Sequence, residues 1–266
     1  YMIERLIRED RLETLDRANI PNADGVIETL RNPDYDPEEQ YSVPYMWGTF
    51  GILYNTEMVD APIDSWTALF DEKYAGKVFM MNSQRDTIGL ALKMLGYSMN
   101  SRDEGELEEA KNVLIAQKQA GIPAGYMLDE IKDKMVGNEA AMGIVYTGDA
   151  IYAMEKNDKL DYVVPKEGSN IWVDGMCIPK GSQNKACAEA FINFMCREDI
   201  AKMNVDYIYY STPIQAVADN LDIDDERILA VINPSKEVTD RCEFFHDTTD
   251  AMDLYEQVWM EVRLAR

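Results

Sequence analysis

The chain has 266 residues, of which 46% are hydrophobic and 28% are charged, and its formal net charge is −23. This length and composition are typical of a globular protein with one large or two medium-sized domains. The negative charge repels nucleic acids and anionic membrane surfaces and attracts cations, which argues against a nucleic-acid partner. No apolar run reaches the roughly 18 residues that a membrane-spanning helix needs.

The first half of the chain predicts helices and strands in alternation. Hydrophobic periodicity, capping residues and turn-forming Pro, Gly, Asn and Asp define these elements. In chain order they are a helix to about Leu15, a strand to Tyr45, a flexible crossing at Gly48, a strand from Phe50 to Tyr54, a helix capped by Ser65, a strand from Lys77 to Met81, and a helix from Gln84 to about Leu95 that Gly96 ends.

The second half continues this alternation, which indicates an α/β protein with largely parallel sheets. Cys187 lies on an apolar stripe with Ala190, Phe191, Phe194 and Met195, so we expect its thiol to be buried. In chain order the predicted elements are an acidic helix in 101–119, a helix around 126–138, a strand in 140–148, a helix in 149–157, a strand in 160–164, a strand around Trp172, one amphipathic helix over 184–208 and two further helices, the last in 249–266.

The motifs of common enzyme classes are missing from the sequence. It contains no G-x-S-x-G, P-loop, G-x-G-x-x-G or H-E-x-x-H pattern, and His246 is its only histidine. A histidine-dependent nucleophile would therefore rest on His246 alone. A pair of carboxylates can drive hydrolysis without histidine, so a carboxylate-dependent hydrolase stays open as one hypothesis.

Tyrosine residues raise a second hypothesis, a ferric-iron site. Tyr207, Tyr209 and Tyr210 in "YIYYSTP" cluster phenol oxygens that could hold trivalent iron. Aromatic residues at a helix end, however, pack against neighbours more often than they bind a metal. The four cysteines show neither C-x-x-C spacing nor the density of a disulfide scaffold.

Trp172 and Asp174 are two residues apart in the β-like run "IWVDGMCIP". Because side chains alternate between the faces of a strand, both lie on one face and Val173 on the other. An indole and a carboxylate together suit an ammonium ligand: the ring attracts the charge and its methylenes, and the carboxylate accepts its N–H donors. A buried tryptophan beside a solvent-facing aspartate explains the same pair equally well.

Ser83 and Asp86 form an S-x-x-D pattern at the start of a predicted helix. The pattern predicts that Ser83 caps the amide of residue 86 and that Asp86 lies in the first turn, where the helix dipole favours a carboxylate. The two residues also stand at a strand–helix turn, where α/β proteins collect ligands. Tyr146, at the end of an apolar strand, has a comparable position.

Longer motifs lie in order along the chain: "YSVPYMWGTFGILYNTEMVD", "SWTALFDEKYAGKV", "ALKMLGYS", "VVPKEGSNIWVDGMCIPKGSQNK", and "INFM" followed by "STP". The most specific pattern among them is P-K-E-G-x-x-x-W-x-D. With these motifs the chain resembles the spermidine/putrescine-binding proteins of bacterial ABC importers. The resemblance implies a two-lobed, hinged type II periplasmic-binding-protein fold, with 1–48 and 175–218 in the N-terminal lobe and 49–174 and 219–266 in the C-terminal lobe.

The resemblance also implies a function. The protein would not be an enzyme; it would capture putrescine or spermidine in the cleft between its lobes and hand it to a membrane permease. It would act as a monomer, without metal or cofactor, in the periplasm or at the cell surface. The implied ligand-binding residues are Trp172, which stacks on methylenes, Asp174, which holds an amine, and Ser83, Asp86, Tyr146 and Tyr1.

Three departures from the family pattern bear on the ligand. Ser83 lies where some members have an aspartate, which leaves the number of paired amines, and hence spermidine against putrescine, open. Phe245 lies near a glutamine of some members, and a phenyl ring cannot accept a hydrogen bond. The chain also starts at Tyr1, after the family's first strands and helices, so we expect a processed or shortened N-terminus and an incomplete N-terminal lobe.

Overall fold

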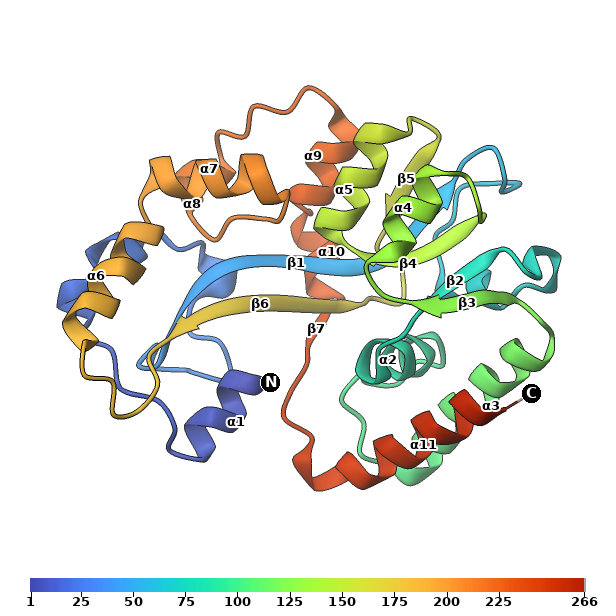
Figure 1. Cartoon of the computed structure of the whole chain (residues 1–266), viewed down its shortest axis with the longest axis horizontal. Helices are drawn as coiled ribbons and strands as arrows, with labels where there is room; N and C mark the ends of the chain where they lie inside the picture. Colours follow the sequence, from blue (N-terminus) through green and yellow to red (C-terminus); the bar gives the residue numbers. More distant parts are fainter. Residues whose placement is uncertain (266) are drawn as a thin grey trace. The chain divides into compact units, whose positions relative to one another are not determined.

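The computed structural model describes residues 1–265, which form two compact units (Figure 1). Unit 1 contains residues 1–48 and 172–225, and unit 2 contains residues 49–171 and 226–266. The chain therefore changes unit after Gly48, Ile171 and Asp225. The lobes expected from the sequence differ at the last two crossings, which they place after residues 174 and 218. That the two units act as ligand-binding lobes stays a prediction.

The strands described in residues 1–265 form a mixed sheet in the order β3-β2-β4-β1-β6-β7, with β5 also paired to β1. β2 is parallel to β3 and β4, and β6 is parallel to β7, but β1 is antiparallel to β4 and β5. The expectation of largely parallel sheets is thus wrong for β1, because the order of elements does not decide which neighbours a strand pairs with. The bounds are β1 Ser42–Asn55, β2 Val78–Met81, β3 Pro123–Met127, β4 Met142–Tyr146, β5 Leu160–Val163, β6 Asn170–Cys177 and β7 Glu243–Phe244.

β1 is one continuous strand, so the predicted interruption at Gly48 is wrong. Trp47 is 4% exposed and exchanges backbone hydrogen bonds with Ser211, and its indole Nε1 donates to the carbonyl of Thr212 at 3.0 Å. Phe50, on the other side of the glycine, is fully buried. Burial and pairing on both sides of Gly48 keep the backbone extended despite the flexibility of glycine.

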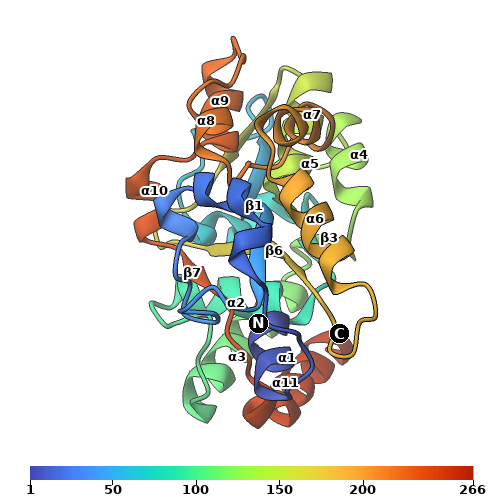
Figure 2. The same cartoon turned by 90° about the vertical axis from the view of Figure 1, so that its left-hand side faces the viewer.

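Three helices of unit 2 lie where the sequence predicts helices, and they cover its core. They are α2 (Gln84–Met94), α3 (Glu104–Gln119) and α11 (Met252–Leu264), which pack against one another (Figure 1, Figure 2). Gly96, with φ of 88°, follows the end of α2 as expected. Arg266, the end of the last predicted helix, lies outside the described residues. The buried side chains of these helices include Ile88, Leu92, Leu107, Leu114, Tyr255 and Val258.

Other helices are shorter or more numerous than the sequence predicts. α1 (Met2–Arg8) ends before the expected Leu15, because Asp10 adopts a left-handed φ of 54° and Leu12 bridges to Pro179 instead. Ser65 caps as predicted, accepting from the amide of Thr67, but the helix it caps is a 3-10 helix. Other α-helices are α4 (Glu130–Val136), α5 (Thr147–Lys156), α8 (Gln215–Ala218), α9 (Glu226–Ile232) and α10 (Lys236–Asp240). No helix in residues 1–265 is both long and apolar enough to span a membrane.

The predicted helix over 184–208 is two helices, α6 (Lys185–Met195) and α7 (Glu198–Ile208), because Arg197 is extended, with ψ of 140°. The predicted burial of the Cys187 stripe is also wrong. Cys187 is exposed, and Phe191 and Phe194 are 59% and 40% exposed. The buried face instead carries Ile192 and a charged residue, Glu189, so polar partners rather than apolar spacing decide how α6 is turned.

Glu189 ties the N-terminal loop to α6. Its carboxylate is 1% exposed and accepts hydrogen bonds from the amide of Asp16 (2.8 Å), Asn19 Nδ2 (2.7 Å) and Lys185 Nζ (2.5 Å). Burial alone would raise the pKa of Glu189, but these donors and the charge of Lys185 lower it to about 2. The ionised form therefore stabilises unit 1.

We expect Glu189→Gln to lower the free energy of unfolding by about 1–3 kcal/mol at pH 7, the usual cost of losing hydrogen bonds to a buried charge. A lowered pKa contributes stability above the unfolded-state value, and this stability is lost as the pH falls through the folded-state value. The difference from wild type should therefore be full above about pH 4.5 and shrink toward pH 2. Urea unfolding across this range measures it. Glu198→Gln, at an exposed position on α7, is the control; a difference that stays constant with pH would contradict the assignment.

Candidate functional site

Ser83, Asp86 and Tyr146 lie together in unit 2, where β4 ends and α2 begins. The carbonyl of Ser83 accepts from the amide of Thr87 at 3.0 Å, which starts the helix. One oxygen of Asp86, Oδ2, accepts from Ser83 Oγ (2.5 Å) and from Tyr146 Oη (2.8 Å). The prediction that Ser83 caps the amide of residue 86 is therefore wrong, because its hydroxyl donates to the carboxylate instead.

Asp86 is the buried charge of this group, with only 5% of its surface exposed. Burial raises the pKa of Asp86, while the hydroxyls of Ser83 and Tyr146 and the positive charge of Arg85 oppose the rise. The hydrogen bonds and Arg85 therefore offset only part of the free energy that the ionised carboxylate loses on desolvation. A cation in contact with this carboxylate would offset that cost.

Trp172 and Asp174 lie in unit 1 on β6, which is continuous from Asn170 to Cys177, so both project from one face of the strand. The indole of Trp172 meets the ring of Tyr210 edge to face, with centroids 4.6 Å apart and planes at 79°. Asp174 is exposed, yet partial burial raises the pKa of its carboxyl. Burial and the charge of Asp174 together raise the pKa of Tyr45, which places this phenol close to the carboxylate.

Tyr210 and Tyr45 lie beside Trp172 and Asp174, although the sequence did not predict this proximity. Tyr210 follows Tyr209, which ends α7 in a left-handed conformation with φ of 65°. A positive φ is uncommon for a tyrosine, and no pattern in the sequence predicts this conformation of Tyr209. Tyr1 precedes α1 in the same unit, with 52% of its surface exposed, and its role stays a prediction.

The three tyrosines considered for iron have different surroundings. Tyr207 is 85% exposed, Tyr209 ends α7, and Tyr210 packs on Trp172. Within residues 1–265, no group of three or more His, Cys, Asp or Glu side chains is placed to hold a metal ion. The described contacts therefore give Tyr210 a packing role beside Trp172.

Residues 1–230 match the family of bacterial extracellular solute-binding proteins. The chain belongs to this family. It is 29% identical over 269 residues to the spermidine/putrescine-binding periplasmic protein of Escherichia coli K12, covering 100% of this chain and 76% of the relative. It is 30% identical to the putrescine/cadaverine-binding protein of Pseudomonas aeruginosa, covering 98% of this chain and 77% of that protein.

Solved structures agree with this membership. The spermidine/putrescine ABC transporter substrate-binding protein PotD from Streptococcus pneumoniae is 34% identical, with a TM-score of 0.89 over 100% of this chain and 81% of that one. The TpPotD lipoprotein of Treponema pallidum, at 24% identity, shows the same fold with a TM-score of 0.88 over 98% of this chain and 81% of that one. The predicted type II periplasmic-binding-protein fold is confirmed. The family and its members are solute-binding proteins rather than enzymes, which supports neither the hydrolase nor the ferric-iron alternative.

Proposed function

We propose that this protein binds a polyamine, putrescine or spermidine, and delivers it to an ABC transporter for import. The observation that carries the proposal is the buried Asp86 carboxylate, which accepts from Ser83 and Tyr146 and retains a desolvation cost that a cation would relieve. The polyamine-binding names of the relatives support it.

The chemistry of a polyamine fits the residues of each unit. A protonated amine needs a carboxylate or several acceptors once water is excluded, because an unpaired buried ammonium is costly. Asp86 in unit 2 and Asp174 in unit 1 supply such carboxylates. Aromatic rings beside them, Tyr146 and Trp172, can cover methylenes and add cation–π attraction of about 1–2 kcal/mol per well-placed contact.

The same proposal sets the cellular context. A protein of this kind works outside the cytoplasmic membrane, in the periplasm or at the cell surface, and its partner is the membrane permease. We infer that it acts as a monomer and binds no nucleic acid, in line with its charge of −23. Native mass spectrometry of the purified protein, followed by calorimetry with putrescine and spermidine, tests the proposal and identifies the preferred polyamine. A protein that binds neither would contradict it.

The unit 1 residues have a separate test. We expect Trp172→Ala to weaken polyamine binding by about 5- to 30-fold, because a cation–π contact of about 1–2 kcal/mol is lost. Asp174→Asn should weaken it by about 10- to 100-fold through loss of a charged acceptor. Asp199→Asn, at an exposed aspartate of the same unit, is the matched control and should bind like wild type. Unchanged calorimetric affinity in both site variants would remove Trp172 and Asp174 from the site.

A further inference from the structure

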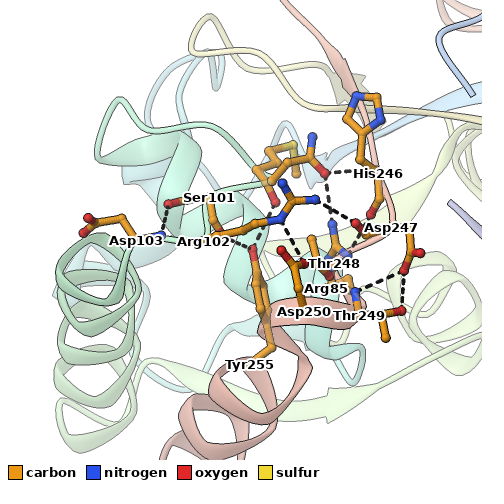
Figure 3. A network of polar contacts seen from close by, with 12 residues as sticks. Arg85, Ser101, Arg102, Asp103, His246, Asp247, Thr248, Thr249, Asp250 and Tyr255 are labelled. Atoms are coloured by element: carbon orange, nitrogen blue, oxygen red, sulfur yellow. Dashed lines mark hydrogen bonds and ion pairs between the residues drawn. The ribbon is translucent and has the colours of Figure 1, made fainter.

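The segment Glu243–Asp250, here called the strap, runs from β7 to α11 and is held mainly by side chains of the α2–α3 region. Figure 3 shows Arg85 and Arg102 both reaching it. Side chains bind three of its backbone carbonyls, one in β7 and two beyond it. Asn100 Nδ2 donates to Phe244 O (2.8 Å), Arg85 Nη1 to His246 O (3.2 Å), and Arg102 Nη2 to Asp247 O (2.8 Å).

Arg85 contacts three residues of the strap: Phe245, His246 and Thr248. Its guanidinium donates also to Thr248 Oγ1 (2.6 Å) and to Asn100 Oδ1 (3.1 Å). It lies over the rings of Phe245 and Tyr255, with the guanidinium carbon 4.5 Å and 5.1 Å from their centroids. These contacts are all with neutral groups, and they hold the planar guanidinium in one orientation.

The first turn of α2 is held by side chains other than a cap, among them Arg85 and Thr87, whose hydroxyl donates to the carbonyl of Met81 at 2.6 Å. Ser83 makes no side-chain capping bond to the helix amides, since its hydroxyl is used by Asp86. A helix whose first turn lacks a capping bond is more prone to fray. Arg85 and Asp86 are adjacent in this turn and diverge by about 100° around the helix axis, so one reaches the strap while the other reaches Tyr146.

We propose that Arg85 is a positioning residue for the Asp86 site: by clamping the strap onto the first turn of α2, it fixes the turn so that Asp86 faces Tyr146. The inference rests on the proposed function for its ligand, but the positioning itself belongs to the ligand-free protein. Arg102 offers a comparison, because it binds the same strap through Asp247 O and pairs with Asp250 at 3.1 Å.

Electrostatics gives the clamp a second effect. The charged and titratable groups that contact or act on Asp86 include Arg85 from α2 and Tyr146 from β4. Arg85 in turn lies over the ring of Tyr255 from α11, and it binds His246 through the backbone carbonyl. Arg85 opposes the rise in the pKa of Asp86 that burial causes. Removing its charge should therefore raise the pH at which Asp86 titrates, an effect that mere loosening of the strap at Arg102 would not produce.

The experiment compares Arg85→Gln, Arg85→Lys and Arg102→Gln. In ligand-free protein labelled with ¹³C at aspartate carboxyls, the Asp86 signal is assigned by its loss in Asp86→Asn. We expect Arg85→Gln to raise its titration midpoint and Arg102→Gln to leave it unchanged. Calorimetry with putrescine and spermidine should show binding about ten-fold weaker in Arg85→Gln and within two-fold of wild type in Arg102→Gln.

Arg85→Lys keeps the charge but loses the planar fork, so it should keep the Asp86 midpoint near wild type and still weaken binding. It also preserves the test if Arg85→Gln does not fold. Equal effects of Arg102→Gln and Arg85→Gln, or no effect of either Arg85 variant on binding or titration, would overturn the positioning role. If wild-type protein binds neither polyamine but the carboxyl signal of ionised Asp86 changes position in both Arg85 variants and not in Arg102→Gln, the proposed function fails while the positioning role stands.

Discussion

Asp86→Asn is expected to weaken putrescine and spermidine binding by about 30- to 1,000-fold, corresponding to about 2–4 kcal/mol, and to stabilise the ligand-free protein. Binding suffers because the ammonium group loses its buried carboxylate partner. Stability improves because burial makes the ionised carboxylate costly, whereas an asparagine carbonyl can still accept from Ser83 and Tyr146. The same side chain would thus trade stability for affinity.

The pH dependence of this gain has a definite sign. A group with a raised folded-state pKa contributes stability that is present below its unfolded-state pKa and lost as the pH rises through the folded-state value. The stability advantage of Asp86→Asn should therefore appear near pH 7 and disappear below about pH 4, where the wild-type carboxyl is protonated. Urea unfolding of ligand-free protein at both pH values measures it.

Asp158→Asn, at an exposed aspartate of unit 2, is the matched control and should change neither affinity nor stability. Wild-type affinity in Asp86→Asn would show that the carboxylate does not contact the ligand. A destabilised variant would show that the two hydroxyls compensate fully for its burial.

Gly168→Ala should lower the free energy of unfolding by at least about 3 kcal/mol, through a left-handed backbone and a backbone clash together. Gly168 ends the P-K-E-G motif, with φ of 91°, and its carbonyl accepts from Trp66 Nε1 at 2.8 Å. A Cβ atom here would overlap the carbonyl oxygen of Arg241, so the backbone would have to move.

Gly76→Ala separates the two contributions, because Gly76 also lies in unit 2 and has φ of 71°, but no atom lies within 4 Å of the place that an added Cβ would take. Its cost should be the backbone strain alone, about 1 kcal/mol. Urea unfolding of both variants gives the comparison. Equal losses would show that conformational strain, rather than the contact with Arg241, explains the glycine of this motif.

Short-range patterns predicted several parts of the protein correctly. The sequence predicted a helix from Gln84 to about Leu95, a last helix in 249–266 and a strand from Lys77 to Met81, which correspond to α2, α11 and β2. The alternation of a strand placed Trp172 and Asp174 on one face of β6. Each of these features depends on interactions within a few residues, so the local sequence contains the physical information that decides it.

Tertiary packing decided the features in which distant segments meet. Asp86 accepts from Tyr146, 60 residues away, and Arg85 binds the strap more than 160 residues away. In 184–208 the apolar stripe expected to be buried is exposed and Glu189 is buried instead, because Asp16 and Asn19 donate hydrogen bonds to its carboxylate. Periodicity predicts which face of an element is apolar. It does not predict which segment covers that face, or which donors pair with a buried carboxylate, because these are determined only when the whole chain has packed.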